Sequence, residues 1–221
     1  MDEETRYTAE RLRMVDEQLR KRDIRDPRVL DAMRYIPRHL FVPPEHRHLA
    51  YSDGPLPIGG GQTISQPYIV ALMTQLLELQ GEEKVLEVGT GSGYQAAVLS
   101  HLAKEVHSIE RDASLAEGAR QVIYALGLDN LHVHTGDGSA GLEAHAPYDA
   151  ILVTAAAPDV PPGLLQQLVD GGSLVIPVGG RLGQYLEKWW RKGAEFSQDI
   201  LVPVAFVPLR GRYGWENDWG Y

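Results

Sequence analysis

The chain is predicted to fold as a doubly wound α/β domain, and three observations in the sequence support this. From residue 81 to about residue 180, short apolar segments alternate with helical ones, a pattern typical of a parallel sheet with helices on both faces. The first of these segments runs into a glycine-rich turn and then a helix. Beyond residue 180 two apolar segments follow each other without a helix, which predicts an antiparallel hairpin at one sheet edge.

Helices are expected in the N-terminal part of the chain over residues 8–22, 27–36 and 66–79. The first has a narrow apolar stripe of Leu12, Val15 and Leu19. The second begins at Asp26-Pro27, a favourable helix start. Between the second and third helices, residues 38–66 are rich in proline and glycine and lack periodicity. Irregular stretches of this length are usually functional or disordered.

The α/β core is predicted to contain seven strands in a mostly parallel sheet. The strands are expected at residues 84–88, 106–109, 131–134, 148–153, 173–178, 185–191 and 200–209. Helices are expected at residues 94–102, 114–126 and 162–168. We therefore expect one domain overall, made of an N-terminal segment (1–80), an α/β core (81–210) and a C-terminal tail (211–221) that is flexible or folds over the rim of the site.

The composition limits the classes of function. The chain has 221 residues, 43% hydrophobic and 23% charged, as expected of an ordinary globular domain. Its net charge of −9 disfavours a nucleic-acid substrate, because phosphate binding needs clustered Lys and Arg. The absence of cysteine excludes disulfides and thiol nucleophiles. No long apolar run is present and the first residues are acidic, so we expect a cytoplasmic protein without a signal peptide or membrane anchor.

The glycines that follow the first core strand predict a nucleoside site. Gly89, Gly91 and Gly93 stand at alternate positions before a helix that begins at Tyr94. Such glycines allow a sharp turn, close approach of a ligand and close packing of the helix on the sheet. Their Gly-x-Gly-x-Gly spacing differs from the dinucleotide spacing Gly-x-Gly-x-x-Gly. It suits a nucleoside without a pyrophosphate, such as S-adenosylmethionine.

Carboxylates stand at three successive strand ends, where a doubly wound sheet binds its ligand. Glu87 precedes the glycine turn, and Glu110 follows the second strand at the distance expected of a residue that grips a ribose diol. Asp137 follows the third strand and could accept a hydrogen bond from the adenine amine. The fourth strand ends in the small residues 154–157, which leave room for a ligand. Taken singly, Glu110 or Asp137 could equally cap a helix or close a turn.

The segment Asp53-Gly-Pro-Leu-Pro-Ile-Gly-Gly-Gly-Gln-Thr-Ile-Ser-Gln-Pro-Tyr68 closely resembles the signature of the protein-L-isoaspartate O-methyltransferase family. The likeness runs in order from about residue 10 to residue 210. It also includes the segments 41–43, 86–93, 136–138, 146–151, 155–156, 165–168, 171–172, 177–179 and 206–209. Two positions depart from patterns found in some members of the family. Gln66-Pro67-Tyr68 stands in place of Ala-Pro-His, and Arg210 in place of a threonine near the cofactor, so we do not expect Arg210 to contact it.

The resemblance implies a Rossmann-like class I methyltransferase fold. It also implies methyl transfer from S-adenosylmethionine to the free α-carboxylate of L-isoaspartyl residues in damaged proteins and peptides. Ser65 would orient that carboxylate as the catalytic residue. The implied cofactor-binding residues are Gln62, Thr63, Ile64, Ser65, Glu87, Gly89, Thr90, Gly91, Glu110, Arg111, Asp137 and Gly138. The implied substrate-binding residues are Ile58, Gly61, Thr63 and Ser65.

Other interpretations compete with these. By position alone Ser65 would be the N-cap of the following helix. His132 and His134 share one face of a strand, but the sequence suggests no third ligand, so we expect no metal site. A methyltransferase acting on nucleic-acid amines would show an Asn/Asp-Pro-Pro-aromatic segment after the fourth strand, and residues 153–156 offer none. A non-catalytic binding module is disfavoured by the intact carboxylates and Ser65. We expect a monomer that acts on proteins.

Overall fold

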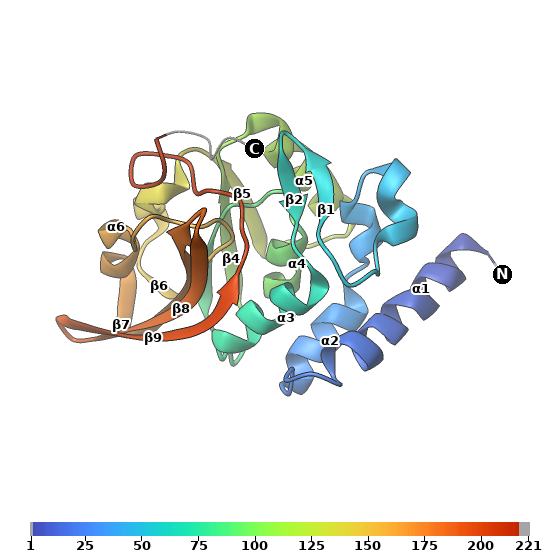
Figure 1. The fold of residues 1–221 in the computed structure, drawn as a ribbon, viewed down its shortest axis with the longest axis horizontal. Helices are drawn as coiled ribbons and strands as arrows, with labels where there is room; N and C mark the ends of the chain where they lie inside the picture. Colours follow the sequence, from blue (N-terminus) through green and yellow to red (C-terminus); the bar gives the residue numbers. More distant parts are fainter. Residues whose placement is uncertain (1, 217–221) are drawn as a thin grey trace.

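The computed structural model describes residues 2–216, with a seven-stranded sheet at the centre (Figure 1). The strands of this sheet are β3 (Lys84–Val88), β4 (Glu105–Glu110), β5 (Leu131–Thr135), β6 (Tyr148–Val153), β7 (Leu168–Gly180), β8 (Gly183–Lys192) and β9 (Glu195–Val204). Their order is β5-β4-β3-β6-β7-β8-β9. The first five pair in parallel, and β8 and β9 continue the sheet antiparallel. The predicted fold class and the C-terminal edge hairpin are confirmed.

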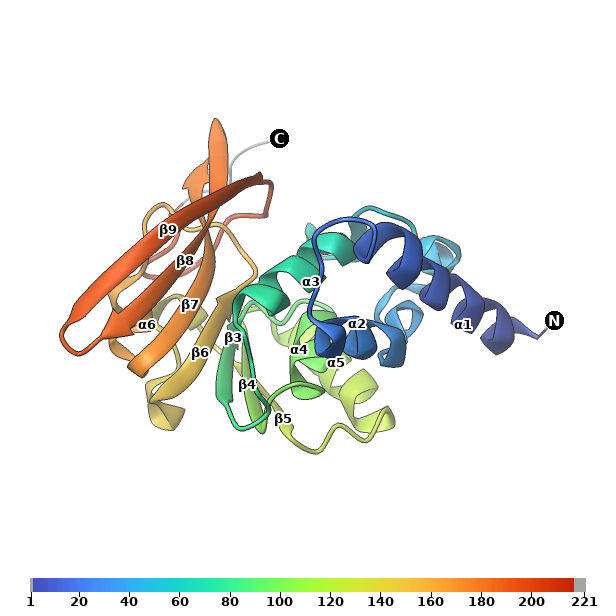
Figure 2. The same ribbon diagram turned by 90° about the horizontal axis from the view of Figure 1, so that it is seen from below.

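Helices cover both faces of the sheet. The α-helices are α1 (Glu3–Met14), α2 (Pro27–Tyr35), α3 (Pro67–Leu76), α4 (Tyr94–Ser100), α5 (Ala113–Ala125) and α6 (Pro162–Gln166). The first five contribute to one apolar core with one face of the sheet, whereas α6 packs into a second, smaller core on the opposite face. In Figure 2 the N-terminal helices and the β8–β9 hairpin lie at opposite ends of the molecule. None of the helices within residues 2–216 is long and apolar enough to cross a membrane.

The sequence placed most core elements to within a few residues, with two exceptions. β7 is much longer than expected, beginning at Leu168 instead of residue 173. It is extended because its first residue pairs with the beginning of β6 at Tyr148, before a register shift. β9 ends at Val204 instead of residue 209. Beyond it, the chain leaves β8, and Pro208 bridges to Ala156 in the loop that follows β6.

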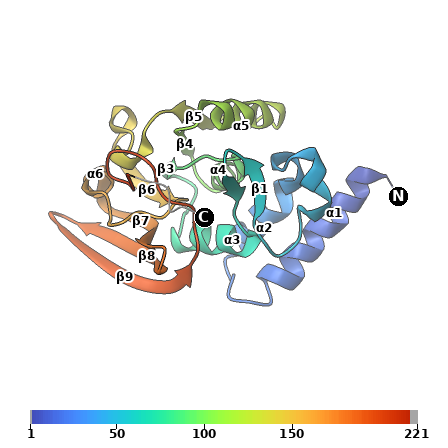
Figure 3. The same cartoon turned by 45° about the horizontal axis from the view of Figure 1, so that its top comes forward.

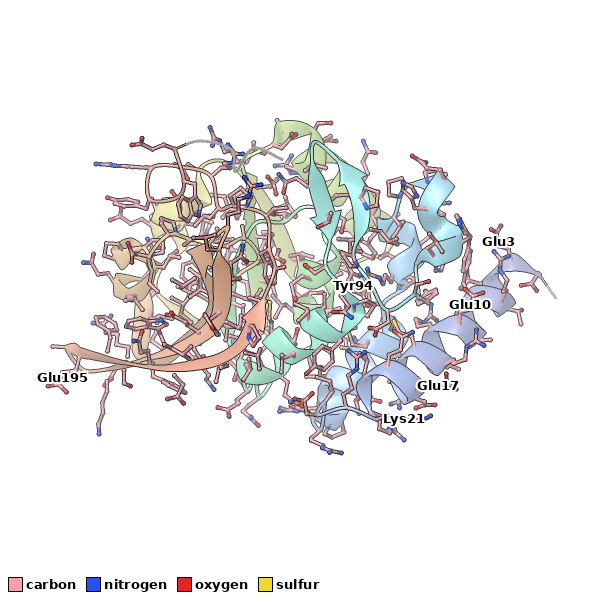
Figure 4. All side chains as sticks on the ribbon, in the orientation of Figure 1. Glu3, Glu10, Glu17, Lys21, Tyr94 and Glu195 are labelled. Atoms are coloured by element: carbon pink, nitrogen blue, oxygen red, sulfur yellow. The ribbon has the colours of Figure 1, made fainter. Side chains whose placement is uncertain are left out.

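The first helix differs from its prediction in its start and its buried face. α1 begins at Glu3, because the Asp2 side chain accepts a hydrogen bond from the Thr5 amide. It continues into one π-helical turn, η1 (Val15–Leu19). The expected apolar stripe is wrong in one member: Leu12 is 42% exposed, and the buried positions are Tyr7, Met14, Val15 and Leu19. In Figure 4, Glu3 and Glu10 of α1 and Glu17 of η1 lie along the outer edge of the molecule, whereas Tyr94 lies inside it.

The proline- and glycine-rich stretch 38–66 is more ordered than its composition indicates. It holds two 3-10 helices, η2 (Arg38–Phe41) and η3 (Pro44–Leu49). They are followed by a small antiparallel hairpin of β1 (Leu56–Gly59) and β2 (Gln62–Ile64). Gly59, Gly60 and Gly61 form its turn with φ of 95°, 58° and 70°, a left-handed conformation that only glycine adopts easily. Figure 3 shows this hairpin between α1 and the large sheet.

The described part of the tail folds back onto the sheet. The Arg212 amide donates to the Asp137 carboxylate (2.8 Å), and the Tyr213 amide donates to the Ser139 hydroxyl (3.0 Å). The Trp215 indole N–H donates to the Ala156 carbonyl (3.0 Å). The tail therefore covers the carboxyl ends of β5 and β6 as far as residue 216, and residues 217–221 of the predicted tail lie outside the described residues.

Candidate active site

A cavity of about 790 Å³ lies at the carboxyl ends of the parallel strands, within the size range of small-molecule sites. Its wall combines the hairpin β1–β2, the glycine turn and the ends of β4 and β6. The lining residues are Gly60–Ser65, Val70, Val88–Ser92, Tyr94, Gln95, Ile109–Asp112, Gly138, Thr154, Ala155 and Val207–Arg210. The cavity thus joins segments from both halves of the chain.

The glycine turn has the geometry that its sequence predicts. Gly89, Gly91 and Gly93 have φ of 98°, 54° and 89°. A Cβ at Gly89 would stand 2.4 Å from the Thr154 hydroxyl, and one at Gly93 would stand 3.1 Å from the Ala119 Cβ. The first glycine therefore lets β3 approach the end of β6, and the third lets α4 pack against α5. Between them, the backbone of Gly91 faces the cavity.

Glu110 is fixed at the end of β4 by two backbone amides. The Gly91 amide donates to its Oε2 (2.8 Å), and the Asp112 amide donates to its Oε1 (2.9 Å). Each oxygen keeps a further lone pair, and the residue is half-buried in the cavity wall. This carboxylate can accept hydrogen bonds from both hydroxyl groups of a diol without leaving its position. Such an arrangement fits the ribose of a nucleoside.

Glu87 lies behind the cavity wall and not in it. Its side chain is fully buried, the Ser108 hydroxyl donates to its Oε2, and its Oε1 has no partner among the described residues. Burial raises the pKa of Glu87 to about 8, against the lowering effect of the Ser108 hydrogen bond. Ser108 also contacts the Thr90 hydroxyl at 2.5 Å. Glu87 therefore supports the glycine turn from beneath, through Ser108 and Thr90.

Asp137 also stands outside the cavity wall, although Gly138 lines it. The Asp137 carboxylate accepts hydrogen bonds from the Ser139 amide (2.9 Å) and hydroxyl (2.7 Å) and from the Arg212 amide. Burial opposes ionisation, but the hydrogen bonds from Arg212 and Ser139 hold the pKa of Asp137 below its usual value. A Cβ at Gly138 would stand 2.7 Å from the Ile109 Cγ2 and 2.8 Å from the Val88 Cγ1. Only glycine therefore fits between Asp137 and the cavity.

Ser65 lines the cavity and is not the N-cap of α3. The N-cap is Gln66, whose side chain reaches the Asp53 carboxylate (2.8 Å) instead of the helix. Among the described residues the Ser65 hydroxyl has no hydrogen-bond partner. Its position along the chain favoured Ser65 as the N-cap of α3. However, Ser65 directly follows β2, which ends at Ile64, and so stands one residue before the N-cap position. Its hydroxyl is left available to a ligand.

The hairpin β1–β2 forms one wall of the cavity. Gln62, Thr63, Ile64 and Gly61 line it, and Ile58 lies just behind, with its Cδ1 3.4 Å from the position of a Cβ at Gly91. The turn at Gly60 comes close to the Asp112 carboxylate at the start of α5. The hairpin therefore spans from the glycine turn to the next helix, beside Arg111 in the same wall.

Several lining residues were not singled out from the sequence. Tyr94 and Gln95 follow the glycine turn, and Val70 lies on the inner side of α3. Residues 207–210 line the cavity because Pro208 pairs with Ala156. Their place depends on that long-range pairing, which no local pattern indicates. Arg210, which we did not expect at the cofactor, lies in this wall. Tyr68 does not, and its hydroxyl donates to Asp23 (2.7 Å).

Comparison with known proteins agrees with this site. Residues 9–214 match the model of the family described as protein-L-isoaspartate(D-aspartate) O-methyltransferase. A protein-L-isoaspartate O-methyltransferase from Methanoregula boonei is 55% identical over 94% of this chain and 96% of its own. A protein-L-isoaspartate O-methyltransferase 1 from Syntrophobacter fumaroxidans is 56% identical over 96% of this chain and 99% of its own.

Two solved structures share the fold along most of the chain. A protein-L-isoaspartate O-methyltransferase superposes with a TM-score of 0.83 at 28% identity, covering 92% of this chain and 67% of that one. A Plasmodium falciparum structure described as a putative protein-L-isoaspartate O-methyltransferase, in complex with S-adenosyl-L-homocysteine, gives a TM-score of 0.79 at 25% identity and covers 90% of this chain and 98% of that one. On this evidence the chain belongs to the protein-L-isoaspartate(D-aspartate) O-methyltransferase family.

Proposed function

We propose that this protein transfers the methyl group of S-adenosylmethionine to the free α-carboxylate of L-isoaspartyl residues in damaged proteins and peptides. The observation that carries the proposal is the Ser65 hydroxyl of a chain of this family, which lines the cavity and has no hydrogen-bond partner within residues 2–216. The resulting ester would collapse without further help to a succinimide, which partly reopens as normal aspartate. The reaction thus begins the repair of the backbone.

The acceptor needs orientation more than activation. An α-carboxylate with an ordinary pKa of about 3.5 is already ionised at neutral pH, so the site requires no strong general base. It must hold the carboxylate in line with the methyl group and keep water away. The Ser65 hydroxyl can donate a hydrogen bond to one carboxylate oxygen. Gly61 and Thr63 line the same cavity, and Ile58 lies behind its wall. We assign these three residues and Ser65 to the substrate.

The residues of the cavity fit S-adenosylmethionine, which supplies a methyl group bound to a positively charged sulfur. We assign the ribose to Glu110, whose two oxygens keep lone pairs towards the cavity. Gly89, Thr90 and Gly91 would border the methionine part, and Gly138 the adenine. The hairpin residues Gln62, Thr63, Ile64 and Ser65 would cover the cofactor, with Arg111 beside the ribose. Glu87 and Asp137 would serve the cofactor indirectly, because they fix the glycine turn and Gly138 from behind the wall.

Paired peptides test this function. The full chain is incubated with labelled S-adenosylmethionine and with two peptides that differ only in an L-isoaspartyl or an aspartyl residue. We expect base-labile label on the isoaspartyl peptide alone. Label on neither peptide, from a protein that still binds S-adenosylhomocysteine, would contradict the substrate; label on both would contradict the specificity. A duplex DNA and an RNA tested in parallel cover the competing nucleic-acid reaction, for which we expect no transfer.

We further propose that the protein acts on proteins as a monomer in the cytoplasm and does not bind nucleic acid. The net charge of −9 supports the proposal that the protein does not bind nucleic acid, because a phosphate backbone would be repelled. Light scattering during size-exclusion chromatography should give a mass close to the 24.5 kDa of one chain. A mass twice as large would refute the monomer.

A further inference from the structure

The side of the sheet around β4 and β5 carries a group of histidines away from the cavity. Between β5 and β6 the chain forms only two 3-10 turns, η4 (Gly138–Ala140) and η5 (Glu143–His145), so no α-helix from this crossover covers the sheet. His107 is the register partner of Leu86 and of His132, and Ile109 is the partner of His134. These side chains therefore share the face that holds the smaller core.

Three of the histidines bring ring nitrogens together. One nitrogen from each of His107, His134 and His145 lies within 4.8 Å of the other two. The His107 Nδ1 and the His134 Nε2 are 3.0 Å apart. The His145 ring stacks on His107 with centroids 4.2 Å apart and planes inclined by 28°. The sequence suggested no third ligand for His134, because β4 and η5 meet β5 only in the folded chain.

The second nitrogen of His107 has the partner expected of a metal-binding imidazole. Its Nε2 lies 3.3 Å from the Glu105 Oε1. Ligating histidines usually donate their other ring N–H to a carboxylate or carbonyl, which fixes the tautomer. With the proton on Nε2, the Nδ1 lone pair of His107 points at His134. Glu105 also lies 3.7 Å from the His132 Nε2, so it brings negative charge to the whole group.

Hydrogen bonds hold the turn that carries His145 in place. The turn carrying His145 is fixed at both ends: the Lys84 amine donates to the His145 carbonyl (2.7 Å), and the Tyr148 hydroxyl donates to the Leu142 carbonyl (2.7 Å).

We propose that His107, His134 and His145 form a binding site for a divalent transition metal, Zn²⁺ above all. Three imidazoles suit Zn²⁺, Cu²⁺ and Ni²⁺, whereas Mg²⁺ and Ca²⁺ prefer oxygen ligands. In a tetrahedral Zn²⁺ site with Zn–N bonds of about 2.05 Å, ligand nitrogens lie about 3.3 Å apart. The His107–His134 pair is already close to this spacing. The His145 nitrogen lies within 4.8 Å of both, and its ring would have to turn out of the stack on His107 to complete the site.

A metal bound at this site would link η5, the turn before β6, to the edge strand β5. His107 stands three residues before Glu110 on β4, about 10 Å along the strand from the methyl-transfer cavity. The metal therefore has a structural role, and the inference does not depend on the proposed function. Its occupancy should change stability and leave methyl transfer unaltered.

The test uses the full chain freed of metal by a chelator. Titration calorimetry with ZnCl₂ should give one equivalent of bound Zn²⁺, and Zn²⁺ should raise the melting temperature. Co²⁺ should give the intense visible bands of a tetrahedral site. His145→Phe keeps a ring stacked on His107 but removes a ligand, so we expect at least tenfold weaker Zn²⁺ binding and loss of the thermal shift. Glu105→Gln should weaken binding by about 10- to 100-fold.

The control is His48→Ala, an exposed histidine of η3 outside the group, for which Zn²⁺ affinity should equal that of the wild type. His134→Gln provides a second ligand variant in case His107→Ala, at a buried position, fails to fold. Equal Zn²⁺ affinity in the wild type, His145→Phe and His134→Gln would overturn the proposal. So would a weak, octahedral Co²⁺ spectrum, because either result would describe scattered surface binding.

Discussion

Replacing Ser65 with alanine separates a catalytic hydroxyl from a helix cap. In the structure this hydroxyl lines the cavity and has no partner among the described residues, and Gln66 occupies the cap position. A hydrogen bond from a hydroxyl to an ionised carboxylate is worth about 1.5–3 kcal/mol. If Ser65 makes that bond during methyl transfer, Ser65→Ala should lower kcat/KM by about 10- to 150-fold.

The same substitution should leave stability almost unchanged. Loss of a serine N-cap costs about 1 kcal/mol, which would lower the melting temperature of a chain of this size by about 2–4 °C. Because Ser65 makes no hydrogen bond to the helix, we expect a change below about 1 °C. Initial rates with an isoaspartyl peptide and thermal unfolding, measured on one preparation, give both numbers. The matched control is Ser197→Ala, an exposed serine of the edge strand β9. A lowered melting temperature with unchanged turnover would refute the argument.

Three further substitutions test the cofactor site. Glu110→Gln should weaken S-adenosylhomocysteine binding by at least tenfold in calorimetry, because the neutral amide loses the charge-assisted hydrogen bonds to the ribose. Glu117→Gln, at an exposed position of α5, serves as the control. Equal affinity in the two variants would argue against Glu110 as the ribose-binding residue. Glu87→Gln should gain stability relative to the wild type as pH rises. The pKa of Glu87 is raised from 4.5 to about 8 in the folded chain, so between these values the native state holds a proton that the unfolded chain has lost, and wild-type stability falls with pH by up to about 1.4 kcal/mol per unit. Parallel pH profiles of unfolding would contradict this. Gly138→Ala should lower the free energy of unfolding by about 1–3 kcal/mol, because the added Cβ would collide with Ile109 and Val88. Gly54→Ala should lower it little, because a Cβ there has no neighbour within 4 Å. Equal losses of stability in the two variants would contradict this steric reason.

Local patterns in the sequence were sufficient for most of the framework. Alternating strands and helices predicted the sheet, since each parallel strand needs a crossover, and the bounds of β3 and β6 agree with the structure. The apolar stripe of the first helix failed at Leu12, because the π-helical turn after Met14 rotates the face that later residues present. A hydrophobic pattern assumes a constant helical period, and this turn changes it.

For the candidate site, the sequence identified some residues that line the cavity and others that lie outside its wall. Glu110 and Gly91 follow strand ends, where chain direction alone brings them to the cavity, and both line it. Glu87 precedes the same turn, but the alternation of side chains along β3 directs it to the interior beside Ser108. Asp137 follows a strand end too, yet its oxygens are engaged by Ser139 and by the tail.

The sequence by itself predicted the family, the cofactor and the reaction, from the glycine turn, the carboxylates at the strand ends and the Thr63-Ile64-Ser65 segment. The tertiary structure alone decided which side chains meet. It made Gln66 the N-cap of α3, so the Ser65 hydroxyl is left available to a ligand. It brought Arg210 into the cavity wall through the pairing of Pro208 with Ala156. It also assembled three histidines from separate elements. Such meetings depend on pairings between distant segments, whose geometry no local pattern encodes.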